Sequence, residues 1–297
     1  MFLLIPKRWD GLACYLDTER AANKEFMERM GIDYKKLWQP EKIPNSIEEV
    51  FSVIERVTAA ARTKMKDKKK PVVIVWDSVA ATCGSGESET EYEKSAGMAL
   101  EARAMSRGFR KVLPTLNLGF VTLICINQLR EKIGVSFGDS DTTPHGKSLP
   151  FYASVRIKMK SKKQIKDTKT ERTIGVSTDA KVFKNKVGPN WRTASFPLYY
   201  DWGVNDEISL LDFCTENDIV TGSTWRSFMY NGVEHKFQGT AKWVELLKDP
   251  EILAYIKGKV QDMMLIKHDR KPDSIELDGE SLMEVEQLKS DIESDSE

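Results

Sequence analysis

Three polar residues that could act on a phosphate group each follow an apolar, strand-like run. They are Glu19, Asp77 and Gln128, and the runs are Leu12–Asp17, Val72–Trp76 and Val121–Asn127. Open α/β sheets bind ligands at the carboxyl ends of their strands, so these positions suit a ligand site. An aspartate there can hold Mg²⁺ through water, and a glutamate can polarise the water that attacks a γ-phosphate. A side-chain amide can bond a phosphate oxygen and move the loop that follows it when the nucleotide changes.

Each of these residues also has a plain structural interpretation, which the local sequence leaves open. Asp77 could be an ordinary strand-end acid that faces solvent. Glu19 could stabilise a helix dipole from the first turn of the helix. Gln128 could cap a strand. The choice depends on whether the three side chains meet in the folded protein.

The segment after Gln128 is polar, rich in glycine and partly basic. It leads to a second apolar run, Ala153–Met159, which we expect to form the next strand. A loop of this length in a compact domain is usually functional or disordered. Cationic side chains and unhindered backbone N–H groups suit a sequence-independent hold on single-stranded nucleic acid.

The elements that must position these residues follow an α/β pattern. Strands are expected at 12–17, 72–77 and 121–127, and helices at 18–30, from Ser46 to about 64, and at 96–113. Ser46 and Glu49 have the spacing of a capping box. Alternating strands and helices, with a fully apolar run at 72–76, indicate a buried parallel sheet.

Beyond Arg156 the chain changes character. A lysine-rich, hairpin-like segment and a strand at 178–187 are expected first, then a helix at 206–217, a hairpin at 225–237 and helices that end near Met264. We therefore expect a small second domain after the core. From Pro272 onward the composition favours a disordered or weakly helical segment.

The charges are balanced in number but not in position, since 45 basic and 45 acidic residues give a formal net charge of zero. From Pro272 to the end there are ten acidic residues and a single base, Lys289. The rest of the chain therefore carries a net positive charge of about nine. This distribution suggests a polyanionic partner and a tail that competes with it, although a tail that only improves solubility would have the same composition.

Cysteine and histidine spacing argues against disulfides and zinc. Cys14, Cys83, Cys125 and Cys214 are far apart and form no CxxC pair, and the three histidines share no ligand spacing. We expect reduced thiols in a cytoplasmic protein. No apolar run reaches transmembrane length, so no membrane association is expected.

Several of these segments resemble the RecA family of bacterial and phage strand-exchange recombinases. The motif NQLREKIGVSFG, a Thr-Thr pair, a glycine and FYASVR occur in family order, and the resemblance extends from about Leu12 to about Asp269. It implies a RecA-type ATPase core with a mostly parallel central sheet at residues 1–204. It also implies a small α+β domain at 205–270 and an acidic tail at 271–297. ATP and Mg²⁺ are the implied cofactors, and the implied partners are single- and double-stranded DNA and further copies of the chain in a helical filament.

The resemblance also assigns roles to individual residues. Glu19 matches the catalytic glutamate, Asp77 the acid that holds Mg²⁺ through water, and Gln128 the γ-phosphate sensor. Lys184 and Lys186 match two lysines that reach a neighbouring subunit's ATP. The residues matched to nucleotide binding are Asn23, Phe26, Asp77 and Ser78. The residues matched to DNA binding are Arg103, Arg110, Arg130, Lys132, Gly134, Gly146 and Lys147.

One part of the family pattern is missing from these 297 residues: no GxxxxGK[ST] phosphate loop occurs. The family places that loop and the first strand of its sheet before the segment that matches Leu12. We therefore expect part of a split or truncated gene, with a separate N-terminal fragment that carries the phosphate loop. The chain alone is expected to hydrolyse no ATP. The alternative is a non-catalytic DNA-binding or filament-modulating protein that has lost ATP hydrolysis.

Overall fold

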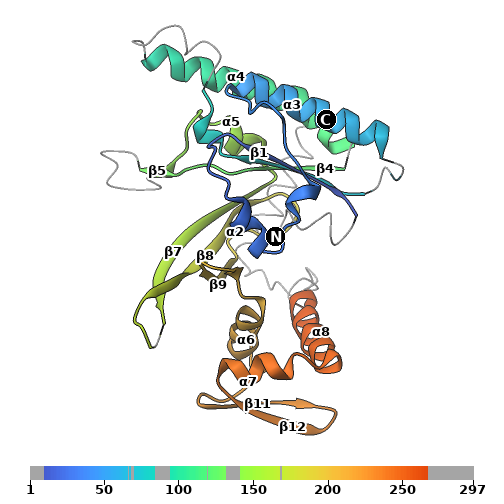
Figure 1. The fold of residues 1–297 in the computed structure, drawn as a ribbon, viewed down its shortest axis with the longest axis vertical. Coiled ribbons are helices and arrows are strands. Elements are labelled where there is room, and N and C mark those ends of the chain that lie inside the picture. The colour runs from blue at the N-terminus through green and yellow to red at the C-terminus, as the bar shows by residue number, and fades with distance from the viewer. Residues whose placement is uncertain are drawn as a thin grey trace, which may run out of the picture. The chain divides into compact units, whose positions relative to one another are not determined.

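The fold is described from a computed structural model, which describes residues 10–65, 67, 70–83, 94–118, 120–131, 141–167 and 169–266 (Figure 1). The chain divides into two compact units, Met1–Val204 and Asn205–Glu297. Each unit is considered separately below. Among the described residues, no helix has both the length and the apolar character needed to cross a membrane.

A four-stranded, all-parallel sheet forms the centre of the first unit. Its strands are β1 (Leu12–Asp17), β2 (Leu37–Trp38), β3 (Val72–Asp77) and β4 (Val121–Cys125), in the order β2-β1-β3-β4. Asp17 lies opposite Asp77, and Trp76 lies opposite Cys125. The carboxyl ends of β1, β3 and β4 therefore meet at one edge, as the α/β prediction requires.

Two long helices cover one face of this sheet, α3 (Ile47–Lys64) and α4 (Lys94–Leu118), which lie side by side in Figure 1. The rings of Phe51 and Trp76 meet edge to face at 5.7 Å, and those of Phe51 and Phe109 at 5.1 Å. The predicted capping box at the start of α3 is confirmed. Ser46 Oγ accepts from Glu49 N at 3.2 Å, and Glu49 Oε2 accepts from Asn45 N at 2.8 Å.

The opposite face of the sheet is covered by a shorter segment that includes α2 (Lys24–Arg29) and the 3-10 turn η2 (Tyr34–Lys36). Met27, Ile32 and Leu37 are buried with the sheet residues on this side. The helix that was expected to begin at residue 18 therefore begins only at Lys24. The carboxylate of Asp17 accepts from the N–H groups of Ala21 and Ala22 at 3.1 and 2.9 Å, which holds this stretch in a turn until α2 begins.

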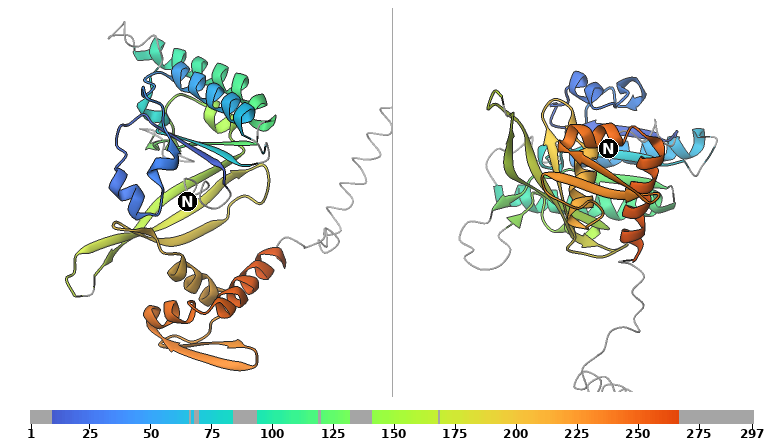
Figure 2. Two further views of the ribbon diagram at one scale, coloured as in Figure 1. Left: turned by 45° about the vertical axis from the view of Figure 1, so that its right-hand side comes forward. Right: turned by 90° about the horizontal axis from the view of Figure 1, so that it is seen from below.

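A second sheet of the first unit is antiparallel. It contains β7 (Val155–Lys166), β8 (Thr173–Asn185), β9 (Thr193–Tyr199) and β10 (Gly203–Val204), in the order β10-β9-β8-β7. Figures 1 and 2 show β7 and β8 as a long, curved hairpin. The apolar run that starts at Ala153 does form a strand, but β7 begins two residues later and is mostly exposed. Val155, Ile157 and Met159 are 42–53% exposed.

The connection between the two sheets contains short elements. These are β5 (Arg130–Glu131), which pairs antiparallel with β6 (Asp141–Thr142), and the helix α5 (Ser148–Tyr152). A 3-10 turn, η3 (Val79–Ala81), follows β3 directly. It places the residues after Asp77 next to the residues that precede α5.

The second unit is a small α+β assembly. Its elements are α6 (Asp206–Glu216), β11 (Trp225–Tyr230), β12 (Val233–Gln238), α7 (Gly239–Leu246) and α8 (Pro250–Ile266). Phe228, Phe237 and Trp243 form its aromatic core, and the indole N–H of Trp243 donates to Glu207 O at 2.9 Å. The acidic tail predicted at 271–297 lies outside the described residues.

Candidate functional site

The edge where β1, β3 and β4 end brings together three polar side chains. Glu19 Oε1 accepts from Gln128 Nε2 at 3.4 Å, and the same oxygen accepts from the hydroxyl of Ser78. Each residue follows a different strand of the parallel sheet. Glu19 precedes α2 by five residues, so the alternative that places it in the first turn of that helix is wrong.

Backbone contacts hold the Glu19 segment against the end of β3. Thr18 N donates to Asp77 O at 2.7 Å, and Thr18 Oγ1 donates to Ser78 O at 2.8 Å. The peptide bond between Asp77 and Ser78 is cis. Glu19 itself is exposed, so its carboxylate remains open to solvent and to a ligand.

Asp77 is half-buried and has a partner that the sequence did not predict. The hydroxyl of Tyr15 donates to Asp77 Oδ2 at 2.7 Å. Burial raises the pKa of Tyr15, and the hydrogen bond to Asp77 raises this pKa further. Tyr15 lies opposite Val75, two residues before Asp77 on the same face, and a diagonal neighbour of this kind is within reach of an aromatic side chain. Strand alternation combined with the register could have found this contact.

The donor set at this edge fits a nucleotide phosphate with Mg²⁺. Asp77 and Glu19 supply carboxylates, Ser78 a hydroxyl, and Gln128 an amide. The neighbouring Asn127 has a buried side-chain nitrogen without a hydrogen-bond partner, which a phosphate oxygen could satisfy. Within the described part of the chain, no group of three or more His, Cys, Asp and Glu side chains could hold a metal. Mg²⁺ commonly binds one or two carboxylates together with substrate phosphates and water, so this limit does not conflict with the donor set.

Asn23 and Phe26, the residues matched to adenine binding, lie together at the start of α2. Asn23 Oδ1 accepts from Phe26 N at 2.9 Å and so caps the helix. Asn23 is exposed, and Phe26 is only partly buried. Met27 is the residue of this turn that enters the core. Phe26 is therefore not a fully buried core residue, and part of its ring is accessible.

The described residues matched to DNA binding lie on α4 and on the connection between β4 and β7. Arg103 and Arg110 are exposed on α4, and Gly146 and Lys147 are exposed immediately before α5. Arg130 begins β5. Lys132 and Gly134 lie outside the described residues.

Lys184 and Lys186 lie at the end of β8. The Lys184 ammonium group donates to the carbonyl oxygens of Pro150 and Phe151, at 2.8 and 2.9 Å. Partial desolvation lowers the pKa of Lys184, and the positive charges of Lys186 and Arg156 add to this effect. Lys186 is exposed. In this arrangement Lys184 holds the carbonyl end of α5, and Lys186 is the freer of the two cations.

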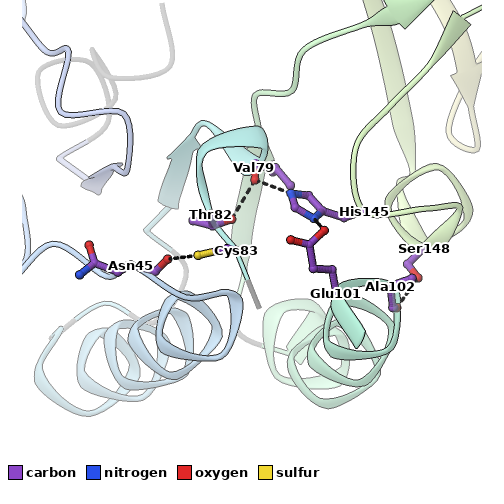
Figure 3. Close-up of polar contacts among 8 residues, drawn as sticks. All are labelled: Asn45, Val79, Thr82, Cys83, Glu101, Ala102, His145 and Ser148. Atoms are coloured by element: carbon purple, nitrogen blue, oxygen red, sulfur yellow. Dashed lines mark hydrogen bonds and ion pairs between the residues drawn. The ribbon is translucent and has the colours of Figure 1, made fainter. Parts of the chain in front are cut away.

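A histidine to which the sequence analysis assigned no role, His145, joins three segments (Figure 3). His145 Nδ1 lies 2.8 Å from Glu101 Oε2 on α4, and His145 Nε2 lies 2.9 Å from the Val79 carbonyl oxygen in η3. The side chains of His145 and Glu101 are only 5% and 12% exposed. Neither residue has a local signal in the sequence, because the three segments are distant along the chain.

Comparison with known proteins gives a consistent result. The family model described as the RecA N-terminal domain matches residues 5–205. "Protein RecA" of Clavibacter michiganensis subsp. michiganensis is 35% identical over 256 residues, which is 86% of this chain and 67% of that protein. "Protein RecA" of Staphylococcus aureus is 36% identical over 256 residues, which is 86% of this chain and 69% of that protein. Residues 5–205 include all the candidate site residues named above.

Proposed function

We propose a function for this chain from one premise: it belongs to the RecA family. The proposed function is that of a RecA-like recombinase in recombination and DNA repair. It binds single-stranded DNA in an ATP-dependent manner, forms helical filaments and exchanges homologous strands. We infer that it does so together with a segment that supplies the phosphate loop.

The observation that carries this proposal is the contact between Gln128 and Glu19. It joins Glu19, which would orient the water that attacks the phosphate, to Gln128, the first residue of a loop matched to DNA binding. A change in the position of the Gln128 side chain would also move the backbone that leads to Arg130. This connection supports a coupling between the bound nucleotide and the affinity for DNA.

Each side chain at the site has a chemical role in this proposal. Asp77 would hold Mg²⁺ through water, in the orientation set by Tyr15. Bound Mg²⁺ would neutralise charge on the phosphate oxygens. Glu19 would orient the attacking water and accept its proton. Ser78 and Gln128, which both donate to Glu19 Oε1, would hold that carboxylate in place.

The free side of β4 supports the proposed partner segment. Among the described residues, β4 pairs only with β3 and lies at the edge of the parallel sheet. Unpaired backbone groups on an edge strand readily accept a further strand. A segment that carries GxxxxGK[ST] after a strand could pair here, and its loop would then lie beside Glu19 and Gln128 at the same sheet edge.

Filament formation is proposed from the exposed surface near β8. Lys186 is exposed, and the neighbouring Val187 is 82% exposed. A cation beside an uncovered apolar residue is suited to contact a second copy of the chain. Lys186, and Lys184 if it leaves the α5 carbonyl oxygens, would then stabilise charge at the neighbouring subunit's ATP.

The absence of GxxxxGK[ST] from the 297 residues favours a second candidate function. Without the backbone amides and the lysine of that loop, phosphates lose most of their positive surroundings. The chain could then be a DNA-binding or filament-modulating protein that hydrolyses no ATP. The two candidates differ in whether addition of a phosphate-loop segment produces ATP turnover.

The test of DNA binding is the salt dependence of affinity for an oligo-dT strand. We expect binding by the full chain to weaken as salt increases, because cations on the protein displace counterions from the phosphates. Replacing Arg130 and Lys132 together by alanine should weaken binding. It should also lower the magnitude of the slope of log affinity against log salt concentration by about 1.4. Each phosphate that is no longer neutralised accounts for about 0.7 of that slope on single-stranded DNA.

The matched control replaces Lys35 and Lys36, two exposed cations of η2, by alanine. This variant has the same change in net charge, and its slope should stay close to that of the unmodified chain. No binding of oligo-dT when ATP and a polypeptide that supplies the phosphate loop are present would contradict the proposed function. An unchanged slope in the Arg130 and Lys132 variant would contradict the assignment of the loop.

A further inference from the structure

We propose that His145 is a positioning residue that links the end of the DNA-binding loop to the segment after Asp77. This inference rests on the proposed function. It adds a specific connection through which DNA at the loop and a nucleotide at the sheet edge affect each other. Of the residues matched to ATP or DNA binding that the structure describes, none bonds both to Glu101 and to Val79.

The hydrogen bonds of the His145 ring give the first argument. Both ring nitrogens face acceptors, the Glu101 carboxylate at 2.8 Å and the Val79 carbonyl oxygen at 2.9 Å. The ring is almost fully buried, and loss of either partner would leave a polar group unpaired away from water. The three residues therefore form one connected unit.

The backbone around His145 gives the second argument. His145 has φ 62° and Gly146 has φ 75°, so two consecutive residues are left-handed. This region is uncommon for residues other than glycine and persists when surrounding contacts hold it. A Cβ on Gly146 would lie 3.1 Å from the Cβ of Ala102, and Ser148 Oγ donates to Ala102 O at 3.3 Å. The end of the loop is thus packed on α4 at the residue after Glu101, as Figure 3 shows.

The position of Val79 gives the third argument. Val79 comes two residues after Asp77, and Val79 N donates to Ile126 O at 2.9 Å, two residues before Gln128. The Val79 carbonyl oxygen also accepts from Thr82 Oγ1 at 2.8 Å. Val79 is therefore bonded on one side to the strand end that leads to Gln128 and on the other to the loop end at His145. A shift at the sheet edge is transmitted to residues 145–147 through one carbonyl group.

The test compares amide hydrogen exchange of residues 79–82 with and without saturating oligo-dT. In the unmodified full chain, DNA should slow exchange at these amides, although they lie in η3 and outside the proposed DNA contacts. The main variant is His145→Asn, because asparagine tolerates the left-handed backbone but is too short to span both acceptors. It should lose the DNA-dependent change at 79–82, and its affinity for oligo-dT should fall about tenfold, within the usual range of coupling between sites.

Two further variants separate this role from a general structural one. Ser148→Ala removes a nearby bond to α4 but leaves the His145 bridge, so it should keep the exchange response. Glu101→Leu removes the carboxylate acceptor on α4, and it should lose the response as His145→Asn does. If His145→Asn fails to fold, as judged by circular dichroism, Glu101→Leu takes its place in the comparison.

The outcomes distinguish this inference from the proposed function. Failure of the unmodified chain to bind oligo-dT when ATP and a polypeptide that supplies the phosphate loop are present would overturn the proposed function and this inference with it. Binding without any change in exchange at residues 79–82 would overturn only the role of His145. Retention of the full exchange response in folded His145→Asn and Glu101→Leu would overturn the role of His145 as well. The salt slope of both variants should match that of the unmodified chain, because neither change removes a phosphate contact.

Discussion

Gln128 donates through its side-chain amide to Glu19 Oε1 at 3.4 Å, although the two residues are 109 positions apart in the chain. The contact exists because β1, β3 and β4 run parallel and end at the same level. The strand-cap interpretation of Gln128 does not account for this contact. The residues with the most direct relation to phosphate chemistry therefore lie together at one sheet edge.

We expect no ATP hydrolysis by the purified chain alone, because no GxxxxGK[ST] segment is present to hold the phosphates. When a polypeptide that supplies this segment is added with DNA, phosphate release should appear. Glu19→Gln should then lower kcat by a factor of about 10²–10⁴, as expected for loss of a general base.

The control for this measurement is Glu25→Gln, which changes an exposed acid in the first turn of α2 and should leave kcat unchanged. Turnover by the unassisted chain that Glu19→Gln abolishes would contradict the need for a partner segment.

Tyr15→Phe should lower the free energy of unfolding by about 1–2 kcal/mol, because it removes a hydrogen bond to a half-buried carboxylate. Urea unfolding monitored by circular dichroism measures this change. Tyr34→Phe is the matched control, since the Tyr34 hydroxyl donates to Gln39 Oε1 at a longer distance of 3.3 Å. An equal effect of the two substitutions on the free energy of unfolding would show that the Tyr15–Asp77 bond stabilises the fold no more than the Tyr34–Gln39 bond does.

The same tyrosine predicts a difference between the wild-type chain and Tyr15→Phe at alkaline pH. The pKa of Tyr15 is raised in the folded chain, so its contribution to stability is complete below the ordinary tyrosine pKa of about 10. It is lost progressively as the pH rises above that value, because the unfolded chain then releases the proton more readily. Wild-type stability should therefore fall more steeply than that of Tyr15→Phe above about pH 10. Parallel pH profiles would contradict the raised pKa.

Gly108→Ala should destabilise the protein by about 1–3 kcal/mol, although alanine is the better helix former. A Cβ on Gly108 would overlap the ring of Phe51, where α4 crosses α3. Gly258→Ala provides the contrast, because Gly258 lies within α8 with open space around it and alanine there should raise stability by about 0.5–1 kcal/mol. Urea unfolding of both variants should show changes of opposite sign. A gain in stability for both would mean that α3 and α4 do not approach as closely as described.

Removal of residues 272–297 should increase the affinity for duplex DNA, because this segment has ten acids and one base. Fluorescence anisotropy with a labelled duplex at low and high salt measures the effect, which should decrease as salt screens the charges. A variant that keeps the length but replaces the acids by asparagine or glutamine should behave like the truncation. Unchanged affinity in both would leave the tail with a role in solubility.

Much of the parallel sheet was predictable from the chain alone. The apolar runs that end at Asp17 and Asp77 are long enough to be read as buried strands, and they are strands β1 and β3 with those ends. Ser46 was predictable as a helix cap because its partner, Glu49, lies within one turn. These features depend on contacts between near neighbours or on burial of a whole run.

Other features depended on the folded chain. The start of α2 was predicted too early, because the carboxylate of Asp17 binds the N–H groups that would have opened the helix. The apolar residues of β7 were expected in a second apolar strand but are exposed, because the exposure of strand side chains depends on what packs on the faces of the sheet.

The candidate site shows the same division. Residue type and position after strand-like runs marked Glu19, Asp77 and Gln128 as candidates but left plain structural interpretations open, and the resemblance to the RecA family assigned their roles. The partners Tyr15 and His145 emerged only in the folded chain. Their hydrogen bonds join residues 62 and 44–66 positions apart, and only the register of the strands and the packing of the loop on α4 bring such residues into hydrogen-bond distance.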